Sequence, residues 1–173
     1  MEDKVTKFGN CAHNLSPNVE YILLDVEKSE YNPIEVLATC ASGSLNTLEN
    51  IAKADQVDGD KAAEMLVDLV ESGMAGAAIL LGLKGQVSKL ANQMTDLYAR
   101  KNRDYGNSFD RSMDKFGLVV AAIRIGDKVN RLQSLIEKGG RGEVKDENMA
   151  DTFIDLACYS IMTLMWCAAQ IEK

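Results

Sequence analysis

Apolar and polar residues follow one another along this chain mostly with the period of an α-helix. Between residues 110 and 138, apolar side chains recur every three or four positions, and the same spacing is found over 45–54 and 61–71. Helix-favouring Ala, Leu, Met, Lys and Glu are plentiful, and only 2 prolines occur. We therefore expect an all-α fold in which long helices pack antiparallel to one another.

Turn and capping residues divide this pattern into elements. We expect a loose arm over 1–16, followed after Pro17 by a short helix over 18–27 whose YILLDV run also suits a strand. A helix from Pro33 to 41 is expected to end at Ser42-Gly43-Ser44, and another helix covers 45–54. The next helix, over 61–71, has Asp60 as its N-cap and a stop at Ser72-Gly73. Further helices are expected over 75–101 with a break near Gly82 and Gly85, over 110–138 with a bend or a division at Gly117 and Gly126, and from Glu147 to 170 after Asp146 as N-cap. Residues 100–109 interrupt the pattern with a turn at Gly106-Asn107.

The length and composition fit one compact unit. The chain has 173 residues, of which 46% are apolar and 26% charged, enough for a real core. Within it we distinguish an N-terminal helical extension of unknown role, residues 1–84, from a helical core, residues 85–173. The most apolar run, 74–83, is too short to span a bilayer, so no membrane partner is expected.

Charge is unevenly distributed between the two halves. The net charge is −7, and residues 1–83 hold 5 Lys or Arg against 14 Asp or Glu, whereas the remainder carries a small positive excess. Such an acidic chain is poorly suited to duplex nucleic acid, but its second half can hold a small anion. The 4 cysteines form no C-x-x-C pair and no signal peptide is visible, which favours a reducing cytoplasm.

An acidic row opens the last expected helix. Glu147, Asp151 and Asp155 are spaced by four residues, so they lie on one stripe of a helix whose far end is apolar. Carboxylates beside apolar surface need a partner, because unpaired buried charge is costly. A divalent cation is one such partner, and an Arg or Lys side chain is another.

Two groups of cations are the candidates for the second kind of partner. One is Arg100, Lys101 and Arg103 at the turn, followed by Asp104 and Tyr105; the other is Arg124, Lys128 and Arg131, which share a helix face with Asp127. Such cations can bind phosphate oxygens while an exposed tyrosine stacks on a base or sugar. They are more often the ordinary cations of helix C-termini and of intrahelical ion pairs. A second acidic stripe, Glu64, Asp68 and Glu71, is expected to be a solvated face.

Three motifs in the second half carry a family resemblance. The runs KNRDYG (101–106), IGDKVNRL (125–132) and DENMADTFIDLACY (146–159) resemble the phage and bacterial "nucleotide modification associated" domain family over residues 85–170. That family is similar to the MazG-like all-α nucleoside-triphosphate pyrophosphohydrolases. The resemblance implies a MazG-like bundle, Mg²⁺ held by acidic helices, cleavage between the α and β phosphates, and a homo-oligomer, dimer or tetramer, whose site is built across subunits.

The resemblance assigns roles to residues of this chain. The catalytic and metal-binding set is Glu147, Asp151 and Asp155, with Asp127 as a fourth metal ligand; the substrate-binding set is Arg103, Asp104, Tyr105, Asn107, Lys128 and Arg131. The chain departs from the MazG-like pattern of E-x-x-E and E-x-x-D helices, because its last helix has carboxylates four residues apart. Asp68-x-x-Glu71 is the one candidate substitute for the missing pair.

Three functions therefore compete. The first is a cytoplasmic Mg²⁺-dependent pyrophosphohydrolase of (deoxy)nucleoside triphosphates. The second is a nucleotide-binding or accessory protein of phage nucleotide or DNA modification that does not turn its ligand over. The third is an oligomeric helical interaction protein with Met162, Met165 and Trp166 between subunits. The first two require that the acidic and basic rows face each other across a pocket.

Overall fold

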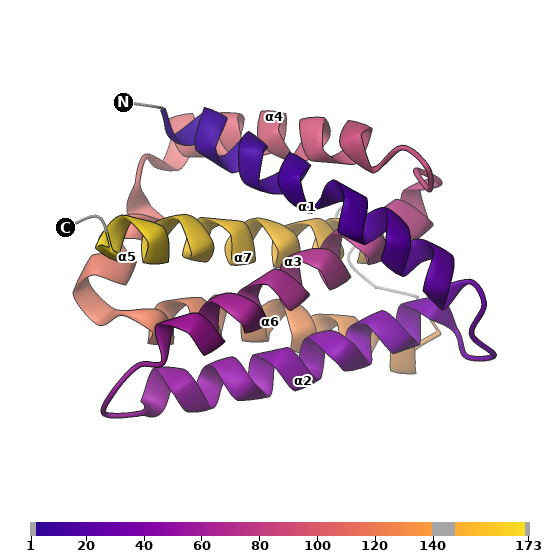
Figure 1. The fold of residues 1–173 in the computed structure, drawn as a ribbon, viewed down its shortest axis with the longest axis horizontal. Helices are drawn as coiled ribbons and strands as arrows, with labels where there is room; N and C mark the ends of the chain where they lie inside the picture. Colours follow the sequence, from indigo (N-terminus) through magenta and orange to yellow (C-terminus); the bar gives the residue numbers. More distant parts are fainter. Residues whose placement is uncertain (1–2, 140–147, 172–173) are drawn as a thin grey trace.

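The computed structural model describes residues 3–139 and 148–171, which form an all-helical bundle with no strand in these two ranges (Figure 1). The helices are α1 (Lys4–Val26), α2 (Pro33–Lys53), α3 (Gly59–Leu81), α4 (Val87–Tyr105), α5 (Ser108–Phe116), α6 (Leu118–Glu137) and α7 (Met149–Ile171). The predicted all-α fold is confirmed.

Side-chain caps begin three of the helices. Carboxylate or amide oxygens of Asp3, Asn32 and Asp58 accept hydrogen bonds from backbone N–H groups in the first turns of α1, α2 and α3. Pro33 occupies the first position of α2, as the sequence predicted. Gly82, at φ 65°, ends α3, since glycine adopts this left-handed conformation without steric cost.

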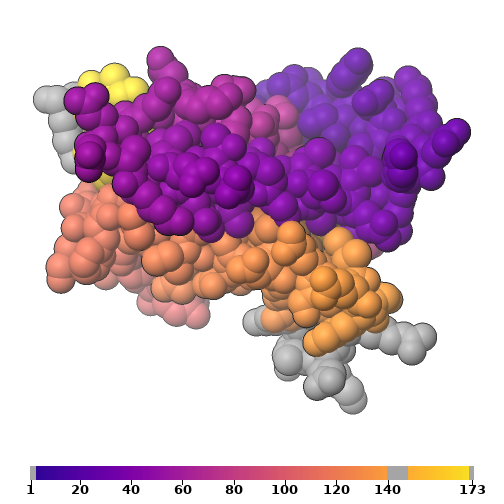
Figure 2. All heavy atoms as spheres, turned by 90° about the horizontal axis from the view of Figure 1, so that it is seen from below, coloured from indigo at the N-terminus to yellow at the C-terminus, as the bar shows by residue number. Residues whose placement is uncertain are grey.

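Helix α7 runs through the middle of the bundle (Figure 1). It packs most extensively against α3 and also against α6, while α2 covers α3 and α6, and α1 packs on α4. Figure 2 shows the face on which α2, in purple, and α6, in orange, lie side by side. One buried cluster draws members from all seven of these helices, including Phe8, Leu48, Leu66, Met94, Met113, Ile125 and Phe153.

The α3–α7 contact is unusually close. A Cβ on Gly73 would lie 2.9 Å from the backbone nitrogen of Ala157 and 2.9 Å from the backbone oxygen of Phe153. A Cβ on Gly76 would lie 2.5 Å from the Phe153 ring. These glycines therefore allow the backbones to approach and bury the aromatic ring between the helices.

Two sequence predictions near the N-terminus are wrong. Residues 1–16 were expected to form a loose arm, and the first helix was expected to begin after Pro17. Instead, α1 starts at Lys4 and continues through Pro17. Burial of Phe8 and Ala12 in the core stabilises this part of the helix. The prediction rested on the mixed polar residues and Gly9 of this stretch and on Pro17 as a helix start, whereas packing decides here.

The expected interruptions at serine and glycine are also wrong in two places. Helix α2 continues through Ser42-Gly43-Ser44, where the hydroxyl of Ser42 donates to the backbone oxygen of Ala38. Helix α3 continues through Ser72-Gly73, and its N-cap is Asp58 instead of Asp60. By contrast, the turn at Gly106-Asn107 and a division at Gly117 are confirmed, although α4 extends to Tyr105 and Gly126 lies inside α6.

Of the described helices, α7 alone has the length and hydropathy that crossing a membrane requires, with a mean hydropathy of 1.4 over its best window. Phe153, Leu156, Ala157 and Ile161 on this helix are fully buried in the bundle. Packing in the core accounts for the apolar character of this face of α7, although only 39% of the window is buried.

Candidate functional site

A cavity of about 370 Å³ opens where the α4–α5 turn meets α6 and α7. The turn forms because Gly106, at φ 58°, takes a conformation that other residues rarely adopt. Its lining includes Lys101, Asn102, Tyr105, Asn107 and Phe109 from the turn region, Arg124 from α6, and Asp155, Cys158, Tyr159 and Met162 from α7. Helix ends that are distant in sequence thus contribute to one concave surface, which we call the first cavity.

Asp155 is held between two lysines at this cavity. Its carboxylate oxygens lie 3.0 Å from Lys101 Nζ and 2.9 Å from Lys128 Nζ. Burial alone would raise the pKa of Asp155, but the hydrogen bonds from Lys128 and Lys101 outweigh it and lower the pKa below its ordinary value. Of the acidic row, Asp155 therefore meets one lysine from each of the two basic groups, as ion pairs beside a cleft.

Arg124 adds a further cation to the first cavity. Its side chain is exposed and makes no ion pair with a carboxylate of residues 3–139 or 148–171. Around the cavity, the three cations Arg124, Lys101 and Lys128 thus accompany the carboxylates of Asp155 and Asp110, and Asp110 is itself paired with Lys4. The local charge favours an anionic ligand.

Aromatic and amide groups line the other part of the cavity. The rings of Phe109 and Tyr159 lie with centroids 5.7 Å apart and tilted by 46°. Tyr105 is exposed at the turn, and the side-chain amides of Asn102 and Asn107 also line the space. Flat apolar rings next to amide donors and acceptors are groups that recognise a nucleobase.

Cys158 offers no nucleophile at this site. Burial, together with a smaller contribution from the charge of Asp155, raises the pKa of its thiol to about 12. The thiol is therefore protonated at neutral pH, and since the thiolate is the reactive form, cysteine chemistry is not expected.

A second cavity, of about 540 Å³, lies next to the first. Helices α1, α5 and α7 supply most of its walls, with Lys4, Lys7, Arg111, Asp114 and Trp166 among the lining residues. The two cavities share four lining residues: Tyr98, Asn107, Asp110 and Met162. They are neighbouring parts of one groove along the α4–α5 turn.

The structure brings together only part of the predicted substrate-binding set. Tyr105 and Asn107 line the first cavity, and Lys128 reaches Asp155 at its edge. Arg103 and Asp104 are exposed and line neither cavity, and Arg131 lies half-buried on α6, also outside both. The cavity does contain one cation from this face, Arg124, which the sequence placed among the candidate cations but not in the substrate-binding set.

The predicted metal ligands are dispersed where they are described. Asp127 is exposed on α6, and Asp151 is exposed and accepts a hydrogen bond from the backbone nitrogen of Asn148, 3.3 Å away. Across residues 3–139 and 148–171, no three His, Cys, Asp or Glu side chains form a group that could hold a metal ion. Glu147 and the predicted N-cap Asp146 lie outside the described residues, so the Mg²⁺ prediction as a whole stays a prediction.

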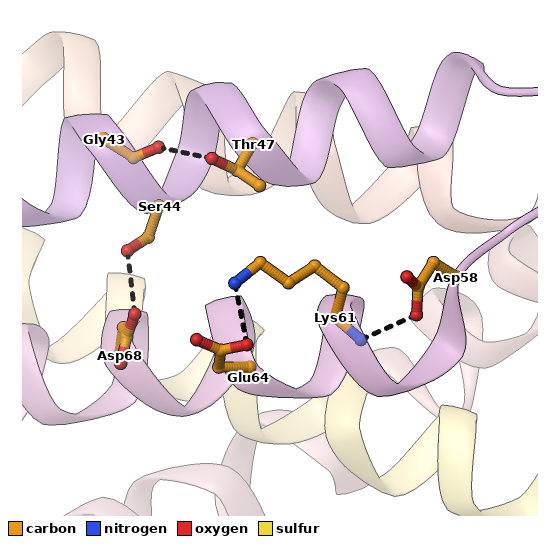
Figure 3. A network of polar contacts seen from close by, with 7 residues as sticks. All are labelled: Gly43, Ser44, Thr47, Asp58, Lys61, Glu64 and Asp68. Atoms are coloured by element: carbon orange, nitrogen blue, oxygen red, sulfur yellow. Dashed lines mark hydrogen bonds and ion pairs between the residues drawn. The ribbon is translucent and has the colours of Figure 1, made fainter.

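The second acidic stripe is divided among local partners. Lys61 Nζ lies 2.8 Å from Glu64, and the hydroxyl of Ser44 donates to Asp68 at 3.3 Å (Figure 3). The amide of Asn18 donates to Glu71 at 3.0 Å. The contacts of Asp68 and Glu71 tie α3 to α2 and α1, whereas the Lys61–Glu64 pair lies within α3. Local partners therefore give the stripe a structural explanation.

Comparison with known proteins identifies the segment that contains the first cavity. Residues 101–166 match the family model described as nucleotide modification associated domain 1, which confirms the resemblance stated from the sequence motifs. All lining residues of the first cavity except Leu97 and Tyr98 fall inside this segment. No curated protein and no solved structure shows a significant match to the chain.

Proposed function

We propose that the first cavity binds a nucleotide, with its base against Phe109 and Tyr159 and a phosphate near Arg124. The observation that carries the proposal is the position of the cavity: nearly all of its lining belongs to the segment that matches a nucleotide modification associated domain. A volume of about 370 Å³ is within the range of small-molecule sites.

The side chains divide the cavity into a base end and a phosphate end. Phe109, Tyr159 and the exposed ring of Tyr105 offer stacking surfaces, and Asn102 and Asn107 offer hydrogen bonds to the edge of a base. Arg124 can donate two parallel hydrogen bonds to phosphate oxygens, and Lys101 adds a positive charge. Together they suit a ligand that is flat at one end and anionic at the other.

Binding without turnover is better supported than Mg²⁺-dependent hydrolysis. Both oxygens of Asp155 already accept from lysines, and the described carboxylates do not gather around a common point. The described residues therefore do not fit a resident magnesium site, and we derive no hydrolytic step. This favours the nucleotide-binding or accessory role among the functions that the sequence suggested.

The decisive binding experiment compares two arginines by calorimetry. Arg124→Ala removes the cation that lines the cavity, whereas Arg103→Ala removes an exposed arginine from the neighbouring helix end that lines neither cavity. We expect Arg124→Ala to weaken nucleoside-monophosphate binding about tenfold, because a hydrogen bond to a charged group contributes about 1.5–3 kcal/mol. Arg103→Ala should leave the affinity unchanged. No binding to the wild type, or equal losses in both variants, would contradict the proposal.

A product assay separates binding from hydrolysis. The wild-type protein is incubated with Mg²⁺ and a panel of nucleoside triphosphates, and pyrophosphate release is measured. We expect none above the background of a heat-denatured sample. Release that Asp151→Asn abolishes would instead support the pyrophosphohydrolase that the family resemblance implies.

A further inference from the structure

Asn107 has a side chain that the fold does not use. It occupies the N-cap position of α5, where an asparagine usually accepts a hydrogen bond from a backbone N–H of the first turn. Here the side chain makes no cap, and its amide has no hydrogen-bond partner among residues 3–139 and 148–171. Because Asn107 lines the first cavity, its amide is available to a ligand there.

Asp110 lies one helical turn after Asn107 and lines the same cavity. Its Oδ2 atom accepts a hydrogen bond from Lys4, whereas its Oδ1 atom has no partner in the part of the chain that the structure describes. A carboxylate has about four lone-pair sites on its two oxygens, so Asp110 can accept further hydrogen bonds. Asp155, another carboxylate of this lining, differs because a lysine binds each of its oxygens.

These two polar groups adjoin the aromatic end of the cavity. Phe109 directly precedes Asp110 in α5, and its ring lies 5.7 Å from that of Tyr159. A base that stacks on these rings presents its edge, not its face, to polar side chains beside them. The amide N–H of Asn107 and the two oxygens of Asp110 offer that edge one donor and two acceptors.

We propose that the first cavity selects guanine, with the Asn107 amide donating to O6 and the Asp110 carboxylate accepting from N1–H and from the exocyclic amino group. This inference rests on the proposed function and adds to it the identity of the base. Guanine carries one acceptor followed by two adjacent donors along its Watson–Crick edge. In adenine, cytosine and thymine an acceptor adjoins the donor of that edge, so one carboxylate oxygen would face a lone pair.

Lys4 acts in this scheme as a positioning residue. It holds Oδ2 of Asp110 from α1 and so fixes the carboxylate at the wall that the two cavities share. Lys4 lies outside the segment 101–166 that matches the family model. Selection of the base therefore depends on the N-terminal helix as well as on the matched segment.

A series of deoxynucleoside monophosphates tests the base preference by calorimetry. Guanine and hypoxanthine differ only in the exocyclic amino group, so deoxyinosine monophosphate is the matched control for deoxyguanosine monophosphate. We expect the guanine nucleotide to bind about tenfold more tightly, since hydrogen bonds to a charged acceptor are strong. The adenine, cytosine and thymine nucleotides should bind about tenfold or more weakly than the guanine nucleotide.

Asp110→Asn should exchange one preference for another. It replaces an acceptor oxygen by a donor amide, which suits xanthine, where an oxygen stands in place of the guanine amino group. We expect the guanine nucleotide to bind about tenfold more weakly and the xanthine nucleotide about tenfold more tightly than in the wild type. A gain of affinity cannot come from misfolding. Asp104→Asn changes the net charge equally at an exposed residue that lines neither cavity, and it should keep the wild-type order.

Two substitutions of Lys4 test its positioning role. Lys4→Met removes the ion pair, and we expect it to lower the ratio of guanine to hypoxanthine affinity about threefold, as suits a partly exposed pair. Lys4→Arg should restore the ratio. The ratio compares two ligands on one protein sample, so a loss of stability alone does not change it. A ratio that stays at the wild-type value in Lys4→Met overturns the positioning role.

The outcomes separate this inference from the proposed function. Equal affinities for the guanine and hypoxanthine nucleotides, or no gain of xanthine binding in Asp110→Asn, overturn the guanine assignment while nucleotide binding stands. Tightest binding of an adenine, cytosine or thymine nucleotide has the same consequence. If the wild type binds none of these nucleotides, the proposed function is contradicted and the base assignment with it.

Discussion

Helix α7 presents two very different surfaces to its neighbours. Toward α3, Phe153 and Ala157 fill the space over Gly73 and Gly76 so closely that no methyl group could be added. Toward the α4–α5 turn, Asp155 and Tyr159 line a cavity. The same helix therefore holds the bundle together on one side and leaves space for a ligand on the other.

The contrast teaches how one amphipathic segment serves both purposes. The α3 side is apolar and close-packed, so a change of one methyl group there affects the free energy of unfolding. The cavity side carries charged and aromatic groups with room around them, so substitutions there should affect binding more than stability. Rigid packing on the first side fixes the position of the groups on the second.

The largest expected effect comes from adding one methyl group to the close-packed side. Gly73→Ala would bring a Cβ within 2.9 Å of backbone atoms of α7, which cannot move as a side chain can. Overpacking of this kind costs about 3 kcal/mol in the free energy of unfolding. Denaturant unfolding followed by circular dichroism measures it.

Gly43→Ala is the matched control for that substitution. Gly43 lies within α2, and a Cβ there would meet nothing within 4 Å. Alanine is the better helix former, so we expect this variant to be more stable than the wild type by about 0.5–1 kcal/mol. Similar losses in both variants would contradict the close α3–α7 contact.

An intermediate effect is expected at the charged edge of the cavity. Asp155→Asn leaves Lys101 and Lys128 without their carboxylate and should lower the free energy of unfolding by about 1–2 kcal/mol at pH 7. This loss is smaller than that for a fully buried ion pair, because Asp155 is partly exposed. Because the pKa of Asp155 is lowered in the folded state, its stabilising effect is present above its unfolded value of 3.8.

The pH dependence of this effect checks its cause. The stability difference between the wild type and Asp155→Asn should persist from neutral pH down to about pH 4 and should disappear as the pH falls through the lowered pKa of Asp155. Urea unfolding at a series of pH values measures it. A difference that does not change with pH would show that packing, and not ionisation, is responsible.

The smallest expected change in stability is at the aromatic end of the cavity. Phe109→Leu keeps an apolar side chain but removes a ring that packs near Tyr159. We expect the free energy of unfolding to change by less than about 1.5 kcal/mol, while nucleotide affinity falls by roughly 1 kcal/mol through lost stacking. Calorimetry and thermal unfolding of the same sample separate the two quantities; loss of stability without loss of affinity would place the base elsewhere.

The sequence predicts the fold class well because helical periodicity is a local property. The caps at Asn32-Pro33 and the breaks at Gly82 and Gly106 also follow from local backbone preferences. It fails at Ser72-Gly73, where small residues serve a contact with a helix some 80 positions later in the chain. A stop signal and a close-packing signal use the same residues, and only the tertiary contact distinguishes them.

The candidate site shows the same limit. The motifs around 101–106 and 146–159 contain residues of the α4–α5 turn and of α7 that line the cavity. The spacing of charges along the sequence could not decide between a metal and a lysine partner for Asp155. The choice of partner depends on how α4, with Lys101, and α6, with Lys128, pack beside α7. Phe109 and Asn102 were missed as candidate site residues, since nothing in their local sequence separates them from other apolar or exposed positions on a helix. Arg124 was grouped with the candidate cations but left out of the substrate-binding set.

Hydrogen exchange with and without a nucleotide tests the central claim most directly, because it reads both sides of α7 in one measurement. The account predicts slower exchange over 101–110 and 155–162, which line the first cavity, and unchanged exchange in α2 and in the N-terminal half of α3. Protection confined to α2 and α3, or no change anywhere at a saturating nucleotide concentration, would contradict it.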